Sequence, residues 1–212
     1  DDTLIFEGMK NSGGIVGINR EGGYISNCSI KGSSKNPVVI ANTTDSDVSS
    51  IGAVTGENYG QIRLKEDTAV YCNVKSYTSG SSIGGIAGIN VGTIKNDSRF
   101  GITDDTSEIS HVEISLAGSD AVYANMGGVA GINDGSIGVC NVNANIIGDL
   151  GTAETGYGGI AGVNNHSISN CGYSGNLLAN GSADNIVNLG GIAGINNAGG
   201  NISSSYVGIL KD

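Results

Sequence analysis

One short pattern of glycine, apolar and asparagine positions recurs six times along the chain and organises the rest of it. Its clearest copy is Gly84-Gly85-Ile86-Ala87-Gly88-Ile89-Asn90, and a further isoleucine, Ile94, follows the asparagine. The copies begin at Gly13, Gly52, Gly84, Gly127, Gly158 and Gly190. A pattern repeated every 20 to 50 residues or so is typical of a solenoid or another repeat architecture.

Besides the first glycine, two further positions of the pattern are the same in every copy, a glycine four residues later and the asparagine two residues after that. These pairs are Gly17 and Asn19, Gly56 and Asn58, Gly88 and Asn90, Gly131 and Asn133, Gly162 and Asn164, and Gly194 and Asn196. Successive asparagines lie 39, 32, 43, 31 and 32 residues apart. If the units stack as coils, glycine above glycine lets a tight coil close, and asparagines in register satisfy one another through amide hydrogen bonds.

A unit of ~31 residues that contains three strand-sized pieces favours one coil of a β-solenoid. We therefore predict an all-β fold, a parallel β-solenoid (β-helix) of about six three-sided coils that forms a single domain over residues 1–212. Residues 1–12 are predicted to be a lead-in whose strand at Leu4-Ile5-Phe6 caps the open end of the array. No segment has the 3.6-residue period of an amphipathic helix.

A sharp corner is expected within each unit, between the fixed isoleucine and the residues that follow it. In Ile25-Ser26-Asn27-Cys28 and Ile168-Ser169-Asn170-Cys171, asparagine occupies the corner because it tolerates the left-handed backbone conformation. We expect Cys72 and Val112 at the cysteine position of copies two and three, with inserted loops before the corner at about 63–68 and 95–108.

The side chains of the first strand of each unit point to two faces. The pattern shows only in part which face is turned toward the core. One column is apolar in every copy and is predicted to face the core: Ile15, Val54, Ile86, Val129, Ile160 and Ile192. The neighbouring positions are Val16, Thr55, Ala87, Ala130, Ala161 and Ala193, followed by Ile18, Glu57, Ile89, Ile132, Val163 and Ile195.

Thr55 and Glu57 favour an exterior position for this second face. Its five apolar members then form an apolar stripe, a candidate docking surface made of Ile18, Ile89, Ile132, Val163 and Ile195. A bulge at the glycine that precedes the stripe is the alternative, and it would turn both isoleucine columns inward.

Composition and charge narrow the function classes. Thirty-seven glycines against one proline, without a strict three-residue period, exclude collagen. The net charge of −10 repels phosphate backbones and anionic lipid, so we expect no nucleic-acid partner. No run of about 18 apolar residues is present, so no membrane insertion by this segment is expected. A start at Asp1 rather than at methionine indicates a module of a longer chain with neighbouring domains.

Candidate chemistry is sparse. A zinc peptidase needs His-Glu-x-x-His on a helix, whereas Ser110-His111-Val112-Glu113 has one histidine in a strand-like pattern. We expect His111 at a corner and His166 in a surface turn. The carboxylates gather in predicted loops, and the best calcium candidate among them is weak: Asp104, Asp105 and Glu108. We predict no other metal site, no catalytic residue and no cofactor.

The four cysteines are expected to lie in adjacent coils as two pairs, Cys28 with Cys72 and Cys140 with Cys171. Stacked cysteines fall within the Cα separation of a disulfide, but their parallel side chains make the required torsion unfavourable. Free buried thiols are therefore favoured over two bridges, and both alternatives stay open at this point.

The phrase Gly-Gly-Ile-Ala-Gly-Ile-Asn-x-Gly-x-Ile-x-Asn-Cys resembles the GLUG motif of bacterial secreted and cell-surface proteins. These proteins include adhesin-like proteins and zinc metallopeptidases that cleave immunoglobulin A. The resemblance extends from Gly13 to about Val207, and copy two departs from it most, with Ala53 and Glu57 at usual glycine and isoleucine positions. The resemblance implies an extracellular or cell-surface location and a non-catalytic role, and it implies no particular ligand.

Three hypotheses for function follow. The first is a non-catalytic module of a bacterial surface or secreted protein that contacts a protein or glycan, or that spaces domains. The second is an accessory region of an immunoglobulin A-cleaving metallopeptidase, whose active site would lie elsewhere in the same gene. The third is a β-helix carbohydrate-active enzyme, which requires carboxylates from adjacent coils to converge in one groove.

Overall fold

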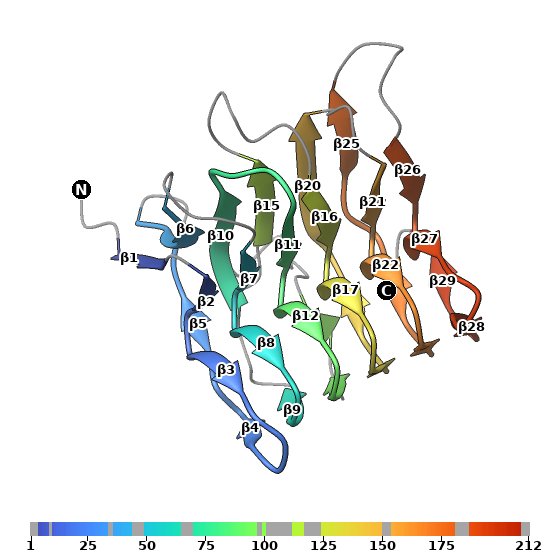
Figure 1. Cartoon of the computed structure of the whole chain (residues 1–212), viewed down its shortest axis with the longest axis horizontal. Coiled ribbons are helices and arrows are strands. Elements are labelled where there is room, and N and C mark those ends of the chain that lie inside the picture. The colour runs from blue at the N-terminus through green and yellow to red at the C-terminus, as the bar shows by residue number, and fades with distance from the viewer. Residues whose placement is uncertain are drawn as a thin grey trace.

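The predicted parallel β-solenoid is confirmed. The computed structural model describes residues 4–8, 10–33, 36–43, 49–64, 70–96, 99–100, 112–116, 124–149, 154–180 and 187–208. These residues form 29 strands and no helix. The strands stack side by side along the longest axis of the molecule, from blue at the N-terminal end to red at the C-terminal end (Figure 1).

The strands form five sheets, and equivalent strands of successive coils lie next to one another in each sheet. The first sheet contains β1 (Leu4–Gly8), β6 (Val38–Asn42), β10 (Val70–Ser76), β15 (Val112–Leu116), β20 (Ala144–Asp149) and β25 (Leu177–Asn180), with β5 (Ile30–Lys31) paired to β10. The second contains β2 (Asn11–Gly13), β7 (Ser50–Gly52), β11 (Ser81–Gly84), β16 (Ala124–Gly127), β21 (Thr155–Gly158) and β26 (Val187–Gly190). The third contains β3 (Val16–Asn19), β8 (Thr55–Asn58), β12 (Ala87–Asn90), β17 (Ala130–Asn133), β22 (Ala161–Asn164) and β27 (Ala193–Asn196).

The remaining two sheets complete each coil. The fourth contains β4 (Tyr24–Ser26), β9 (Gln61–Leu64), β13 (Thr93–Asn96), β18 (Ser136–Gly138), β23 (Ser167–Ser169) and β28 (Asn201–Ser203). The fifth contains β14 (Arg99–Phe100), β19 (Asn141–Val142), β24 (Gly172–Tyr173) and β29 (Tyr206–Val207). The six coils therefore comprise β1–β5, β6–β9, β10–β14, β15–β19, β20–β24 and β25–β29.

Successive coils are in register with the repeat of the sequence. In the third sheet Ala87 lies beside Ala130 and Asn90 beside Asn133, and in the fourth sheet Ile94 lies beside Ile137. Every strand pair in the described residues is parallel, as stacking of equivalent strands requires. Each residue type of the repeat thus forms a column that runs through the coils.

Bends divide each coil more finely than the three pieces that the sequence predicts. The phrase around Gly84 is split by a bend at Gly85 and Ile86, which places β11 in the second sheet and β12 in the third. A side chain at Gly84 would collide with the carbonyl oxygen of Ala87 across this bend, and one at Gly88 would collide with the backbone of Ile51. These positions are glycine in every copy because backbone atoms of the neighbouring segments occupy the space that a side chain would need.

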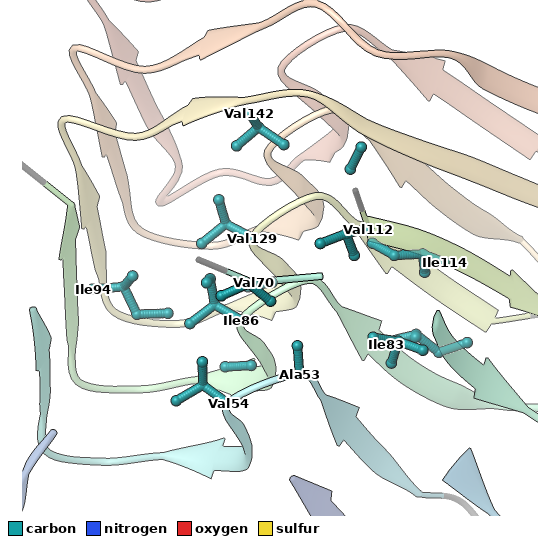
Figure 2. Close-up of a cluster of buried hydrophobic side chains, with 14 of the residues drawn as sticks. Ala53, Val54, Val70, Ile83, Ile86, Ile94, Val112, Ile114, Val129 and Val142 are labelled. Carbon is teal, nitrogen blue, oxygen red and sulfur yellow. The ribbon is translucent and has the colours of Figure 1, made fainter. Parts of the chain in front are cut away.

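The core lies between the sheets and is built from columns of isoleucine, valine and small residues. Val54, Ile86, Val129 and Ile160 are buried, as their column predicts, while Ile15 and Ile192 of the terminal coils are less covered. Figure 2 shows Val54, Ile86 and Val129 following one another in this column through adjacent coils, with Ile83 and Ile114 beside them.

The exterior position predicted for Ala87 is wrong. Ala87 and its counterparts Thr55, Ala130 and Ala161 are fully buried, because the bend before Ala87 turns both Ile86 and Ala87 toward the core. Pairing within the third sheet passes over the next glycine, Gly88, and this interruption shifts the alternation of the strand. Asn90 is consequently buried, whereas Ile89 belongs neither to the core nor to the partly buried residues packed against it.

The corner between the fourth and fifth sheets has the predicted left-handed backbone. Asn27 and Asn170 have φ angles of 53° and 54°, and Val139 and Ser204 occupy the same corner with φ of 56° and 49°. The backbone N–H of Val139 donates to the Ser169 carbonyl, as that of Asn170 donates to Ser203. A β-branched valine therefore holds a conformation that suits asparagine better.

The predicted place of the insertion in copy three is wrong. Strand β14 is the next described strand after β13 and pairs with β19, so this unit reaches the fifth sheet by Arg99. Val112 then begins β15 in the first sheet and lies beside Cys72 and Ala144, so it does not occupy the cysteine position. Of the insertion predicted in copy two at about 63–68, Arg63 and Leu64 belong to β9, and the remainder lies outside the described residues.

The predicted N-terminal strand is present as β1, which pairs in parallel with β6 and forms the N-terminal edge of the first sheet. It occupies this edge as a regular member of the sheet. Leu4, Ile5 and Phe6 remain exposed.

Replacing Val139 with asparagine is expected to stabilise the protein by about 1 kcal/mol, because the left-handed conformation costs an L-residue roughly 1 to 2 kcal/mol and asparagine tolerates it. Val139 is exposed, so little packing is lost. Urea unfolding followed by circular dichroism measures the change. The reverse substitution Asn170→Val should destabilise by a similar amount, and an unchanged Val139→Asn midpoint would contradict the assignment of strain.

Candidate functional site

The fixed asparagines form a continuous ladder of side-chain amides at the turn between the third and fourth sheets. Each Nδ2 donates to the Oδ1 of the asparagine in the following coil: Asn19 to Asn58 at 2.7 Å, and Asn58 to Asn90, Asn90 to Asn133, Asn133 to Asn164 and Asn164 to Asn196 at 2.8 Å. All five bonds run in the same direction along the axis. The ladder holds successive coils in register.

Each ladder amide also supports the turn that follows it. The Nδ2 of Asn58 and of Asn90 lies 3.3 Å from the carbonyl oxygen of Gly60 and of Gly92, respectively. The asparagines of the four inner coils are fully buried, so their amides are available for structure alone. These polar groups therefore stabilise the array at positions where water does not reach them.

The apolar stripe of Ile18, Ile89, Ile132, Val163 and Ile195 runs along the third sheet, and all five residues are half-buried. Register joins Ile89 to Ile132, Ile132 to Val163 and Val163 to Ile195 without a gap, while Glu57 separates Ile18 from the others. Four apolar residues from consecutive coils thus form one uninterrupted row.

The stripe lies against the outer face of the second sheet. On that sheet Ile83, Met126 and Tyr157 point into the core, so the alternate residues Ser82 and Asn125 face outward. Two contacts join the stripe column to this outer face. With its side-chain amide turned so that both polar atoms find partners, Asn11 donates to the Glu57 carboxylate over 3.0 Å, and a Cβ added at Gly156 would lie 3.2 Å from Ile195 Cγ1. The stripe therefore fills the angle between two sheets and is open to solvent on its other side.

Glu57, the polar member of the column, is held by its neighbours. The Tyr59 hydroxyl donates to Glu57 Oε2 at 2.9 Å. This hydrogen bond and the negative charge of Glu57 raise the pKa of Tyr59 above its usual value. The N-terminal part of the column therefore differs chemically from the row of Ile89, Ile132, Val163 and Ile195.

All four cysteines are free thiols. Cys140 and Cys171 lie in adjacent coils, where Asn141 pairs with Gly172, and a hydrogen bond with Cys140 lowers the pKa of Cys171. The expected pairing of Cys28 with Cys72 is wrong, because Ile30 lies beside Val70 and Cys72 belongs to the first sheet. Burial raises the pKa of the Cys72 thiol to about 12.

The other predicted site residues are not brought together. His166 is exposed in the predicted surface turn, and its carbonyl accepts from the backbone of Asn201. His111 and the calcium candidates Asp104, Asp105 and Glu108 lie outside the described residues. Within the described ranges, no three side chains of His, Cys, Asp or Glu form a group that could hold one metal ion.

A shallow hollow of about 370 Å³ lies at the N-terminal end, where Phe6, Glu7 and Asn11 are among its lining residues. Among the described residues that line it, Glu7 is the only one with a titratable side chain. The described lining residues offer apolar surface and backbone groups of the first coil, and they include no acid–base pair for catalysis.

Sequence reasoning missed a second, outer amide ladder. The Asn197 amide donates to Asn165 Oδ1 at 2.6 Å, and the Asn165 amide donates to the Asp134 carboxylate. The signal was the polar residue that directly follows the fixed asparagine in coils four to six. Such solvent-exposed bonds reinforce the stacking of the C-terminal half at small energetic gain.

Replacing Asn133 with leucine is expected to destabilise the protein by about 2 kcal/mol, because the Asn90 amide loses its acceptor and the buried Asn164 Oδ1 loses its donor. Urea unfolding measures the loss. Asn196→Leu is the matched control: this residue is exposed at the last rung, so its replacement should cost less than half as much. Equal costs at both positions would contradict cooperative support by the ladder.

Alkaline pH is expected to destabilise the fold in part through Cys72. The unfolded thiol ionises near pH 9.0, whereas the native thiol stays protonated to about 12. Stability is therefore constant below about pH 9 and falls above it by ~1.4 kcal/mol per pH unit for this group. Cys72→Val should flatten the decline, since valine already occupies the paired position 112. Unfolding free energies at about pH 8 and about pH 10 test this, and identical slopes in both proteins would refute it.

Comparison with protein-family models, with curated proteins and with solved structures found no match. Within the residues that the structure describes, no helix has the length and apolar character needed to cross a membrane. The resemblance of the repeat to the GLUG motif stays a prediction from the sequence.

Proposed function

We propose that this chain is a non-catalytic repeat module of a bacterial secreted or cell-surface protein, and that it contacts a protein or glycan through the apolar stripe. The GLUG-like repeat and the acidic, glycine-rich composition support an extracellular location. The module also spaces the domains on either side of it in a longer chain, since a stack of hydrogen-bonded coils is rigid along its axis.

The observation that carries the proposal is the uninterrupted row of Ile89, Ile132, Val163 and Ile195. These side chains are covered on one side by the second sheet and are open on the other, and they do not belong to the core. An apolar row in the angle between two sheets offers a partner both a flat apolar contact and neighbouring polar groups such as Asn125 and Asn188. Surfaces of this composition favour protein contacts and the apolar faces of sugars.

The recurring polar side chains support a structural rather than a catalytic role for the coils. The ladder asparagines donate to one another and to turn carbonyls. The Cys171 thiol lies 3.3 Å from the Ser169 carbonyl, and the Tyr173 hydroxyl donates to the Ala144 carbonyl at 2.9 Å. Because these polar groups are hydrogen-bonded within the coils, they stabilise the scaffold. We assign binding to exposed surfaces such as the stripe.

The double substitution Ile132→Lys and Val163→Lys tests the proposal. Because both residues are half-buried and outside the core, we expect cooperative unfolding to persist with a loss of stability of about 1 to 2 kcal/mol. Binding of the labelled protein to a mammalian glycan array and to fixed epithelial cells should fall at least tenfold. Val91→Lys, an exposed position on a turn of coil three, is the matched control and should bind as the unchanged protein does.

Three outcomes would contradict the proposal. Loss of cooperative unfolding in the double variant would show that the stripe is part of the core. Undiminished binding of a folded double variant would exclude the stripe as the contact surface. Failure of the unchanged protein to bind either probe would remove adhesion to these surfaces and leave the spacer role.

A further inference from the structure

Two cysteines lie together in the core, at the corner between the fourth and fifth sheets of coils four and five. Cys140 is 1% exposed and Cys171 is fully buried. The residues that directly follow them, Asn141 and Gly172, are paired, so the two cysteines occupy equivalent places in adjacent coils. Equivalent Cα atoms of adjacent coils are about 4.8 Å apart, which is within the range that a disulfide spans.

The two thiols also contact each other. A hydrogen bond joins them, and it lowers the pKa of Cys171. Cys140 Sγ lies 3.4 Å from the Gly138 carbonyl oxygen, and Cys171 Sγ lies 3.3 Å from that of Ser169. Cys171 Sγ is also 4.0 Å from the carbonyl oxygen of Ile137, a residue of coil four, so it is directed toward the coil that contains Cys140. The pair is therefore already assembled for a reaction between its sulfur atoms.

The other two cysteines do not form such a pair. Cys28 occupies the same corner in coil one, and its Sγ lies 3.3 Å from the Ser26 carbonyl oxygen. Ile30 lies beside Val70, so Cys28 is two residues before this point of register and Cys72 is two residues after it. An offset of four positions along a strand is roughly 13 Å, which is too far for a disulfide.

The corner gives a small oxidant a way to the thiols. Val139 precedes Cys140 and Asn170 precedes Cys171, and both of these preceding residues are exposed, with left-handed φ angles of 56° and 54°. A β-branched residue holds this conformation unfavourably. The strands that follow the corner, β19 and β24, have two residues each, so few hydrogen bonds break when this segment opens locally.

We propose that Cys140 and Cys171 are a redox-active dithiol that hydrogen peroxide converts into a disulfide between coils four and five. The Cys171 thiolate attacks one oxygen of the peroxide, the O–O bond breaks and hydroxide leaves, so Cys171 becomes a sulfenic acid. The Cys140 sulfur then attacks the sulfenic sulfur, the S–O bond breaks, and the oxygen leaves as water with the thiol proton. The two sulfur atoms together lose two electrons, and the peroxide gains them.

The order of the two steps follows from the hydrogen bond between the thiols. Cys171 reacts first, because the hydrogen bond with Cys140 favours its thiolate, and the thiolate is the nucleophile. Cys140 is then the resolving thiol, since it is already in contact with the sulfur that has been oxidised. Ser205 follows the corner residue Ser204 in coil six, so the neighbour of Cys171 on that side carries a hydroxyl and cannot resolve the sulfenic acid.

The disulfide joins two coils where a short strand pair holds them. It closes a loop from residue 140 to residue 171 and so removes conformational freedom from the unfolded chain. Oxidation is therefore expected to stabilise the array, and reduction to reverse the effect. The proposal is independent of the apolar stripe, which lies on the third sheet and contains neither cysteine.

Treatment of the folded full chain with a small excess of hydrogen peroxide, followed by mass spectrometry, tests the proposal. Cleavage after glutamate separates the two cysteines at Glu154, so a disulfide keeps peptides 114–154 and 155–212 linked until a reductant is added. Alkylation in denaturant should modify only the thiols of Cys28 and Cys72. We expect the melting temperature to rise by about 5 °C and to return after dithiothreitol.

Two serine variants separate the pair from the other cysteines. Cys140→Ser keeps a hydroxyl beside Cys171 but has no resolving thiol, so dimedone should trap the Cys171 sulfenic acid about tenfold more than in the unchanged protein. Cys28→Ser is the matched control, because it replaces a cysteine at the same corner and leaves the pair intact. It should form the disulfide as the unchanged protein does, and urea unfolding establishes that each variant is folded.

The proposal is overturned if peroxide leaves all four thiols of the folded protein open to alkylation, or if the linked peptides contain Cys28 or Cys72. It is also overturned if Cys171 is oxidised to a sulfinic acid without any linked peptide, because that result shows that Cys140 does not reach it. If Cys140→Ser does not fold, the peptide map and the melting temperature of the unchanged protein decide by themselves.

Discussion

The structure depends on one constraint: every residue of a coil lies beside its equivalent in the next coil. The asparagine ladder enforces this register most strongly, because a buried amide that slips by one residue loses a donor and an acceptor at once. Glycine columns make the register sterically available, since Gly88 and Gly131 lie against the backbones of Ile51 and Ile83. The apolar columns are then buried by the same side-chain packing in each successive coil.

The repeat allowed the architecture to be predicted because its signal is summed over six copies. Parallel pairing, the buried Ile86 column, the amide ladder and the left-handed corner at Asn27 and Asn170 all depend on positions that recur. Predictions failed where a single copy was read alone. Cys72 and Val112 resemble the corner of other copies, but copy three reaches the fifth sheet by Arg99, and Ile94 and Asn96 stand before it with the spacing of Ile25 and Asn27.

Which residues of the first strand face the core could not be predicted from the sequence, for a different reason. Alternation assumes an unbroken strand, whereas the chain bends before Ala87 and the pairing is interrupted at Gly88. Two successive breaks of period put Ile86 and Ala87 inside, Ile89 outside and Asn90 inside again. The same interruption creates the apolar stripe, so the candidate contact surface is a geometric consequence of the glycine that lets the two sheets approach.

In a solenoid of equivalent coils, the packing between neighbouring coils does not itself determine where the stack ends. Each inner coil is satisfied equally from both sides, so the last coil differs from the others only in what covers it. Charged edges, bulges or capping segments supply the stop in most repeat folds. Coil six, over its described residues, has none of the charges and keeps the register of the core. The energetic terms that join coil five to coil six are therefore the same register, apolar columns and amide ladder that join the inner coils to one another.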